Sequence, residues 1–200
     1  MSDSLSRRRL ARAAVRLAGA NGSPLPPLVL MTDDERLQNP LGAAQALPRG
    51  SMVIVRARAA ARRKVLASAL MDLARRRSLF VLIAGDAELA LAVGADGVHL
   101  PETEIGQAAH RRVRGRLIVT AAAHSLSALR LARWVDAVFL SPVFPTASHP
   151  GRGALTPMRA AAIARLADVP VYALGGIDHT NAGRLCGFSG IAAVGALAVA

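Results

Sequence analysis

The sequence has little cysteine and few aromatic residues, and each shortage excludes a class of protein. With the single cysteine Cys186 in 200 residues, the chain can form no internal disulfide and no cysteine-based zinc site, which fits a reducing, cytoplasmic compartment. Aromatic residues make up 3% of the chain, which leaves little surface on which nucleic-acid bases could stack. No apolar run reaches the roughly 18–20 residues that a membrane span requires. We therefore expect no membrane partner.

Lysine is also nearly absent, although positive charge is abundant. The net charge is +12 at pH 7, and every one of the 25 basic residues except Lys64 is an arginine. Most arginines are grouped in stretches of helical periodicity at residues 7–16, 62–77 and 111–116. Such groups are typical of solvated helix surfaces, so we predict no nucleic-acid partner. We expect only Arg56, Arg58 and Arg152 to bind a small anion.

Eight short apolar runs recur along the chain, with helical stretches between most of them. They lie at residues 28–31, 52–55, 79–83, 97–100, 117–120, 137–140, 170–174 and 191–194. Continuous apolar runs of this length are typical of parallel strands that are buried on both faces. Eight strand–helix steps predict an α/β fold of the (β/α)8 barrel class, close to its lower size limit of about 200 residues.

The two ends of the chain depart from a regular barrel. The eighth predicted strand ends near Gly195, so the eighth helix is expected to be missing or truncated. An extra helix is predicted at residues 4–19, and it could cover the open side of the barrel or plug its floor. We divide the chain into an N-terminal helix that packs on the barrel, residues 1–22, and one barrel domain, residues 23–200.

Glycine-containing segments follow the seventh and eighth predicted strands. Gly175 and Gly176 come after the seventh strand, and Gly195 and Ala196 come after the eighth. In (β/α)8 barrels the chemistry takes place at the C-terminal ends of the strands, and a phosphate site often forms at these two positions. Because glycine lets backbone N–H groups approach an anion closely, we predict a phosphate site here.

Polar residues after other strands are expected at the same end of the barrel. Arg56 and Arg58 follow the second strand and alternate with period two, which favours an anion-binding edge, with a surface position for Arg56 as the alternative. A long loop after the sixth strand contains Thr146, Ser148 and His149. Its length and hydrogen-bonding groups favour a second anion-binding edge or a lid over a passive connection.

Two histidines lie in or near the predicted strands. His124 follows the fifth strand and could either act as an acid–base group or brace the following helix; the residues leave both alternatives open. His99 lies within the fourth strand, where a position in the barrel interior is the simpler interpretation. No two histidines have the spacing of metal ligands, so zinc is not expected.

Several of these segments together resemble the thiamine phosphate synthase family, which also contains the thiazole tautomerase TenI. The resemblance covers residues 28–197 and rests on four segments in the family's order, at residues 89–100, 123–126, 141–146 and 173–177. It implies an enzyme of thiamine biosynthesis that joins an aminopyrimidine diphosphate to a thiazole phosphate and releases pyrophosphate, or one that isomerises the thiazole. It also implies that His124 is the acid–base residue and that Gly175 and Gly176 bind the thiazole phosphate.

The resemblance further implies Mg²⁺ on the leaving pyrophosphate for the synthase reaction, but the sequence departs from the family at the metal ligands. The Asn-Asp pair after the third strand is replaced by Ala84 and Gly85, and Asp86, displaced by one position, is also suited to cap a helix. The second metal carboxylate corresponds to Glu104. These departures leave four alternatives: a divergent synthase, a tautomerase, a non-catalytic module that binds or senses a phosphorylated ligand, or another activity on a phosphorylated heterocycle or sugar.

Overall fold

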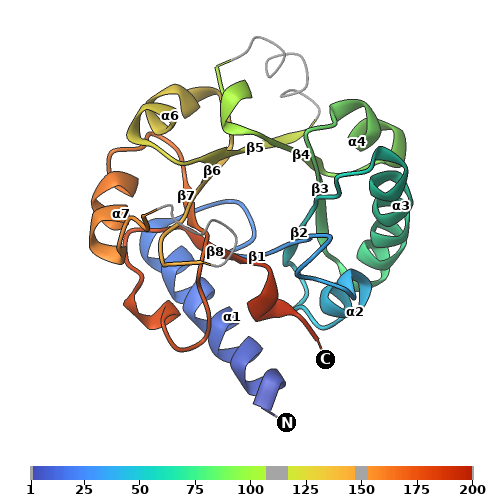
Figure 1. Ribbon diagram of the computed structural model, residues 1–200, viewed down its shortest axis with the longest axis horizontal. Coiled ribbons are helices and arrows are strands. Elements are labelled where there is room, and N and C mark those ends of the chain that lie inside the picture. Colours follow the sequence, from blue (N-terminus) through green and yellow to red (C-terminus); the bar gives the residue numbers. More distant parts are fainter. Residues whose placement is uncertain (1, 107–116, 147–152, 200) are drawn as a thin grey trace.

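Eight parallel strands form a closed barrel in the computed structural model, which describes residues 2–106, 117–146 and 153–199. The strands follow one another around the barrel in chain order, and β8 pairs with β1 to close it (Figure 1). Their bounds are β1 Leu28–Met31, β2 Met52–Val55, β3 Phe80–Ala84, β4 Gly97–Leu100, β5 Ile118–Ala123, β6 Ala137–Leu140, β7 Val171–Ala173 and β8 Gly190–Ala193. The predicted (β/α)8 barrel is confirmed.

Side chains of the strands fill the interior of the barrel. The ring of Phe139 meets His99 edge-on, with ring centroids 5.2 Å apart, and stacks on Tyr172 at 5.0 Å. The hydroxyl of Tyr172 donates to the carbonyl oxygen of Leu25, before β1. A Cβ at Gly190 would collide with the Tyr172 ring, so this close approach requires glycine. The N-terminal end of the barrel is therefore packed.

Helices cover the outside of the barrel and begin at side-chain caps. They are α2 Pro40–Gln45, α3 Ala60–Arg77, α4 Ala87–Val93, α6 Leu126–Leu131 and α7 Pro157–Ala164. Four of them start at a residue whose side chain accepts a hydrogen bond from the first turn: Asn39, Asp86, Ser125 and Thr156. Single 3₁₀ turns complete the described connections: η1 Glu102–Glu104, η2 Ala132–Trp134, η3 Ala182–Arg184 and η4 Gly195–Leu197.

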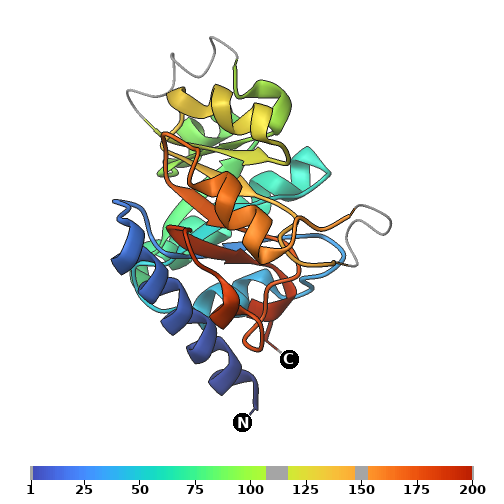
Figure 2. The same cartoon turned by 90° about the vertical axis from the view of Figure 1, so that its left-hand side faces the viewer.

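The N-terminal helix α1, Ser2–Asn21, packs on the side of the barrel formed by β8 and β1 (Figures 1 and 2). Its apolar face is buried there through Leu10, Ala14 and Leu17. Only the turn η4 follows β8 in the described residues, so α1 covers the side that an eighth helix would cover. Arg7 strengthens this contact by donating to the carbonyl oxygen of Ala198, 3.2 Å away.

The arginine-rich stretches lie partly on the helical exterior, as predicted. Arg75 and Arg76 are exposed in the last turn of α3, where positive charge is favourable for the helix dipole. The stretch 111–116 lies outside the described residues. Arg63 is an exception to the prediction, because its side chain is only 21% exposed and lines a cavity. None of the described helices is long and apolar enough to span a membrane.

Candidate active site

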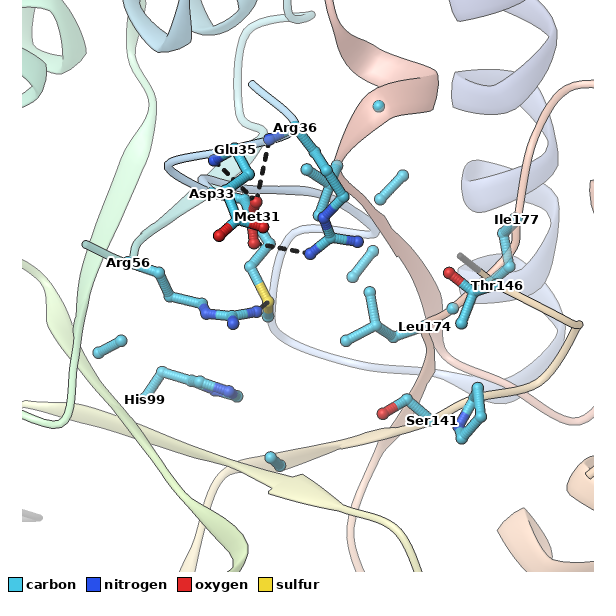
Figure 3. A pocket seen from close by; sticks show the side chains of 18 of the residues that line it. Met31, Asp33, Glu35, Arg36, Arg56, His99, Ser141, Thr146, Leu174 and Ile177 are labelled. Atoms are coloured by element: carbon cyan, nitrogen blue, oxygen red, sulfur yellow. Dashed lines mark hydrogen bonds and ion pairs between the residues drawn. The ribbon is translucent and has the colours of Figure 1, made fainter. Parts of the chain in front are cut away.

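A cavity of about 870 Å³ lies at the C-terminal ends of the strands. All eight strands, or the segments that follow them, contribute residues to its lining. Figure 3 shows Arg56 and His99 on one side of this cavity, with Thr146, Leu174 and Ile177 on the other. The cavity is thus placed where (β/α)8 barrels perform their chemistry.

The segments after β7 and β8 present main-chain N–H groups to this cavity. Gly175 and Gly176 adopt positive φ angles of 94° and 64°, and a Cβ on either glycine would collide with residues 142–145. Among the described residues, the N–H groups of Gly175, Gly176, Gly195 and Ala196 have no hydrogen-bond acceptor. Unpaired N–H groups beside a cavity are suited to an oxyanion. All four residues of the predicted phosphate site line the same cavity.

The loop after β6 packs against the glycine segment. The N–H groups of Val143 and Phe144 donate to the carbonyl oxygens of Leu174 and Gly175, each over 3.0 Å. These two bonds fix the loop against the glycines and bring Thr146 to the cavity wall. The predicted anion-binding residues Ser148, His149 and Arg152 lie outside the described residues, so their role stays a prediction.

His124 lines the cavity directly after β5. Its Nδ1 lies 2.9 Å from the carbonyl oxygen of Ser141 and 3.1 Å from the Ser141 hydroxyl. The carbonyl can only accept, so a bond to it requires the proton on Nδ1, and the neutral ring then has Nε2 as its basic nitrogen. The cap of α6 is Ser125, whose Oγ accepts from the N–H of Ala128. The cap of α6 is therefore not His124, and the acid–base role of His124 stays a prediction.

His99 occupies the interior of the barrel at the bottom of the cavity, as the strand pattern indicated. Its side chain is 6% exposed, and its Nδ1 lies 3.0 Å from the hydroxyl of Thr120. Burial lowers the pKa of His99 to about 3, and the nearby Arg56 guanidinium contributes to that lowering. His99 is therefore neutral at physiological pH and adds no charge to the cavity.

Arg56 and Arg58 both line the cavity, but their charges are compensated differently. Arg58 forms an exposed ion pair with Glu35, with 2.7 Å between Nη1 and Oε1. Arg56 forms no ion pair with any described carboxylate, and its Nη1 contacts the sulfur of Met31 at 3.2 Å (Figure 3). Desolvation lowers the pKa of Arg56 from its usual value, although an arginine stays charged at neutral pH. Arg56 thus has no direct carboxylate partner in the described structure, although Asp33 and Asp34 lie near enough to act on its charge.

Comparison with known proteins agrees with this geometry. The model of the thiamine monophosphate synthase family matches residues 28–197, which include every strand of the barrel. The chain belongs to this family. A thiamine-phosphate synthase of Chlorobium phaeovibrioides is 31% identical over 185 residues, which cover 87% of this chain and 88% of that protein. A thiamine-phosphate synthase of Chloroflexus aurantiacus is 36% identical over 138 residues, or 66% of this chain.

The extent of the match differs between relatives. The chain spans 63% of the Chloroflexus aurantiacus protein and 61% of a relative from Aquifex aeolicus that is 38% identical over 114 residues. The structure of a thiamine phosphate pyrophosphorylase from Pyrococcus furiosus superposes with a TM-score of 0.66 at 23% identity, covering 84% of each chain. That likeness supports the fold of this family member.

The carboxylates that line the cavity of this family member are all engaged with other groups. Asp33 pairs with Arg36 over 2.7 Å, and hydrogen bonds from Arg36 hold the pKa of Asp33 down at about 2. Asp34 accepts from the N–H of Arg58 and pairs with Arg62 over 3.1 Å. The two remaining lining carboxylates are those of Glu35, which pairs with Arg58, and Asp178, which caps a turn through Thr180 and Asn181.

The two carboxylates predicted to bind magnesium do not line the cavity. Asp86 is the N-cap of α4, where its Oδ1 accepts from the N–H of Leu89 over 2.9 Å, so its alternative role as a cap is confirmed. Glu104 lies in η1, outside the lining. No three potential ligands cluster anywhere in the described chain. Because Mg²⁺ needs carboxylate oxygens that are not already committed, the residues present do not fit it.

Two residues with contacts at the cavity had no signal in the sequence. Glu102 accepts from the N–H of His124 over 2.7 Å and from the hydroxyl of Ser125 over 3.0 Å, and so anchors the segment that carries His124. Arg63 reaches the cavity from the first turn of α3, within a run that has the pattern of an ordinary arginine-rich helix. Arg63 follows the C-terminal end of β2 closely in the sequence, and this closeness is the signal that could have indicated a position at the cavity.

Proposed function

We propose that this chain is a transferase of thiamine biosynthesis that joins an aminopyrimidine diphosphate to a thiazole phosphate and releases pyrophosphate. The observation that carries the proposal is one cavity with two different means of binding an anion. The glycine segments after β7 and β8 offer uncharged N–H groups, while Arg56 after β2 offers a permanent charge. Two phosphorylated substrates can therefore bind in the same cavity with their reactive groups between the two anion sites.

The roles of the residues follow from this arrangement. The N–H groups of Gly175, Gly176 and Gly195 would bind the thiazole phosphate. This phosphate does not leave in the reaction, so the site has to hold it in place and does not have to activate it. Arg56 would contact the diphosphate, where negative charge accumulates as the bond to the pyrimidine breaks. The buried, neutral His99 below Arg56 adds no competing charge.

The test is release of pyrophosphate by the purified full-length chain when both substrates are supplied. We expect pyrophosphate and thiamine phosphate to form in equal amounts, and Arg56→Met to lower kcat/KM by about 10²–10³-fold because a group that stabilises the leaving charge is lost. Lys64→Met, an exposed cation on α3, should leave the rate unchanged. If both substrates bind but no product forms beside an active control enzyme, the chain is a binding module instead.

A second candidate function is isomerisation of the thiazole phosphate, and His124 is the observation that favours it. Its Nδ1–H is committed to the Ser141 carbonyl, which leaves Nε2 as the basic nitrogen, and proton transfer within the thiazole requires no metal. We expect His124→Asn to abolish isomerisation and to leave phosphate binding intact.

The matched control for His124 is His179→Asn, which alters an exposed histidine outside the cavity lining. Isomerisation should be measured by the change in the thiazole's NMR spectrum, and binding should be measured by calorimetry. An isomerisation rate that His124→Asn does not lower would remove His124 from the mechanism.

A further inference from the structure

The ion pairs around the cavity do not fully neutralise the positive charge near the ends of β2 and β3. Every acidic residue of the sequence except Asp3 lies in the parts of the chain whose side chains are described, because segments 107–116 and 147–152 contain no Asp or Glu. All four lining carboxylates are engaged with other groups. The cavity therefore has no free carboxylate that could hold a divalent cation against an anionic ligand.

Arg63 is a further cation in the lining of the same cavity. Its Nη1 donates to the carbonyl oxygen of Ala57, 3.2 Å away, and its Nη2 lies 3.4 Å from Oδ2 of Asp86. The distance to Asp86 is longer than those of the Arg36 and Arg58 pairs, and Asp86 also caps α4. The Nε of Arg63 is buried without a hydrogen-bond partner in the described structure. Its charge is therefore only partly compensated.

The position of Arg63 relative to the loop after β3 is informative. Asp86, its partner, directly follows Gly85, which lines the cavity. The resemblance to the family implies a metal-binding carboxylate at the position that Gly85 occupies. A guanidinium thus lies beside the place where a carboxylate would otherwise bring in a cation. Positive charge at this place is supplied by the chain itself.

We infer that the guanidinium groups of Arg56 and Arg63 bind the diphosphate of the pyrimidine substrate and replace the divalent cation in this subsite. The inference rests on the proposed function for the identity of the ligand. Its physical basis is general: a guanidinium presents several N–H donors in a plane, matches two phosphate oxygens at once and stays charged at every physiological pH. The subsite should therefore bind a diphosphate without a metal.

The first experiment titrates inorganic pyrophosphate into the purified full-length protein by calorimetry, once with EDTA and once with excess Mg²⁺. We expect the Kd in EDTA to lie within about threefold of the Kd in Mg²⁺, because guanidinium contacts do not depend on the metal. Pyrophosphate binding that weakens tenfold or more in EDTA, or that is absent under both conditions, would overturn the inference.

The second experiment removes each charge in turn. Arg56→Met and Arg63→Met should each weaken pyrophosphate binding in EDTA by about tenfold or more, as expected for loss of a hydrogen bond between charged groups. Lys64→Met removes one charge from the next residue of the same helix, outside the cavity lining, and should change the Kd by less than about twofold. Equal effects of Arg63→Met and Lys64→Met would contradict a role for Arg63.

A structural role of Arg63 is separated from binding by a conservative variant. Arg63→Lys keeps the charge but loses the planar donor geometry, so it should restore part of the affinity that Arg63→Met loses. Thermal unfolding of both variants shows whether the loop after β3 is intact. If Arg63→Met matches the wild-type Tm and still binds pyrophosphate normally, the inference fails.

The third experiment restores the missing carboxylate. Gly85 has a φ of +65°, which Asp tolerates better than most residues, and a Cβ there would meet no atom within 4 Å. Gly85→Asp should weaken pyrophosphate binding in EDTA and make it Mg²⁺-dependent. If Gly85→Asp binds pyrophosphate equally well in EDTA and in Mg²⁺, the guanidinium of Arg63 and the restored carboxylate do not act at the same place.

These measurements use binding alone, so the inference and the proposed function can fail separately. Metal-free pyrophosphate binding without any product in the transferase assay would leave the subsite established and reject the transferase. Product formation with strictly Mg²⁺-dependent pyrophosphate binding would support the transferase and reject the replacement of the cation.

Discussion

Both main-chain and side-chain groups are available at the cavity to bind an anion. At the end of β7, Gly175 and Gly176 line the cavity with positive φ angles, and their N–H groups have no acceptor among the described residues. At the end of β2, the Arg56 guanidinium carries charge without a carboxylate partner in the described structure. A main-chain site tolerates few substitutions at its glycines, whereas a side-chain site depends on the identity of one residue.

The first prediction concerns this glycine requirement. Gly176→Ala should lower the free energy of unfolding by about 2–4 kcal/mol, because alanine is strained at φ +64° and its Cβ would meet Phe144 and the Pro145 carbonyl oxygen. Gly195→Ala is the control, since its φ is not positive and its Cβ would meet no atom within 4 Å. It should change stability by less than about 0.5 kcal/mol. Urea unfolding of both variants checks this, and equal stabilities would contradict it.

Residues that reach the cavity from regular helices could not be predicted from the sequence. The glycines were predictable because a pair of glycines after an apolar run is typical of a tight turn that brings the main chain close to a ligand. Arg63 was not, because it belongs to a helical run in which its neighbours Arg62 and Lys64 are exposed. Glu102 also gave no signal, since its role depends on a contact with His124, directly after the next strand, which only the closed barrel creates.

At the level of elements, most of the predicted strand boundaries lie within one or two residues of the observed ones. Their apolar runs are short and bounded by polar residues, and β3 and β7 differ from the prediction only at their ends. The largest difference is β5, which continues to Ala123, since three alanines extend it by pairing with β6. The connection after β7 contains only the turn η3 in the described structure, and Asp178 caps the turn before it by accepting from Thr180.

The helix α1 compensates for the missing eighth helix, and its contribution to stability can be measured. Leu10 is fully buried between α1 and the barrel, so Leu10→Ala should lower the free energy of unfolding by about 2–5 kcal/mol. Val15 lies on the same helix but is 61% exposed, and Val15→Ala should change stability by less than about 0.5 kcal/mol. Chemical unfolding measures both. Similar small effects would mean that α1 is not part of the cooperative unit.

At the level of the whole molecule, the surplus of positive charge and the cavity are related only in part. Most described arginines lie on helices, and of the four that line the cavity Arg36 and Arg58 pair with carboxylates after β1. The net charge of +12 therefore describes the surface more than the site. The groups that distinguish the interior are the uncharged His99 and the unpaired Arg56 above it.

The buried His99 makes the stability of the whole barrel depend on pH. Its pKa is about 3 in the folded chain and 6.5 in the unfolded chain, so between these values the unfolded state binds the additional proton. The contribution of His99 is complete above pH 6.5 and is lost as the pH falls from 6.5 toward 3. From pH 7 to pH 5 the loss should amount to about 2 kcal/mol.

The variant His99→Gln tests this dependence. It is expected to be less stable at pH 7, where His99 contributes fully, but its free energy of unfolding should fall by about 2 kcal/mol less between pH 7 and pH 5 than that of the wild type. General repulsion among the arginines affects both proteins alike and cancels in this difference. The stabilisation from the Asp33–Arg36 pair is complete above pH 3.8 and is lost only as the pH falls from 3.8 through the Asp33 pKa of about 2, so it does not change between pH 7 and pH 5. Urea titrations at pH 5 and pH 7 therefore isolate His99, and parallel slopes for both proteins would show that His99 can be protonated within the folded barrel.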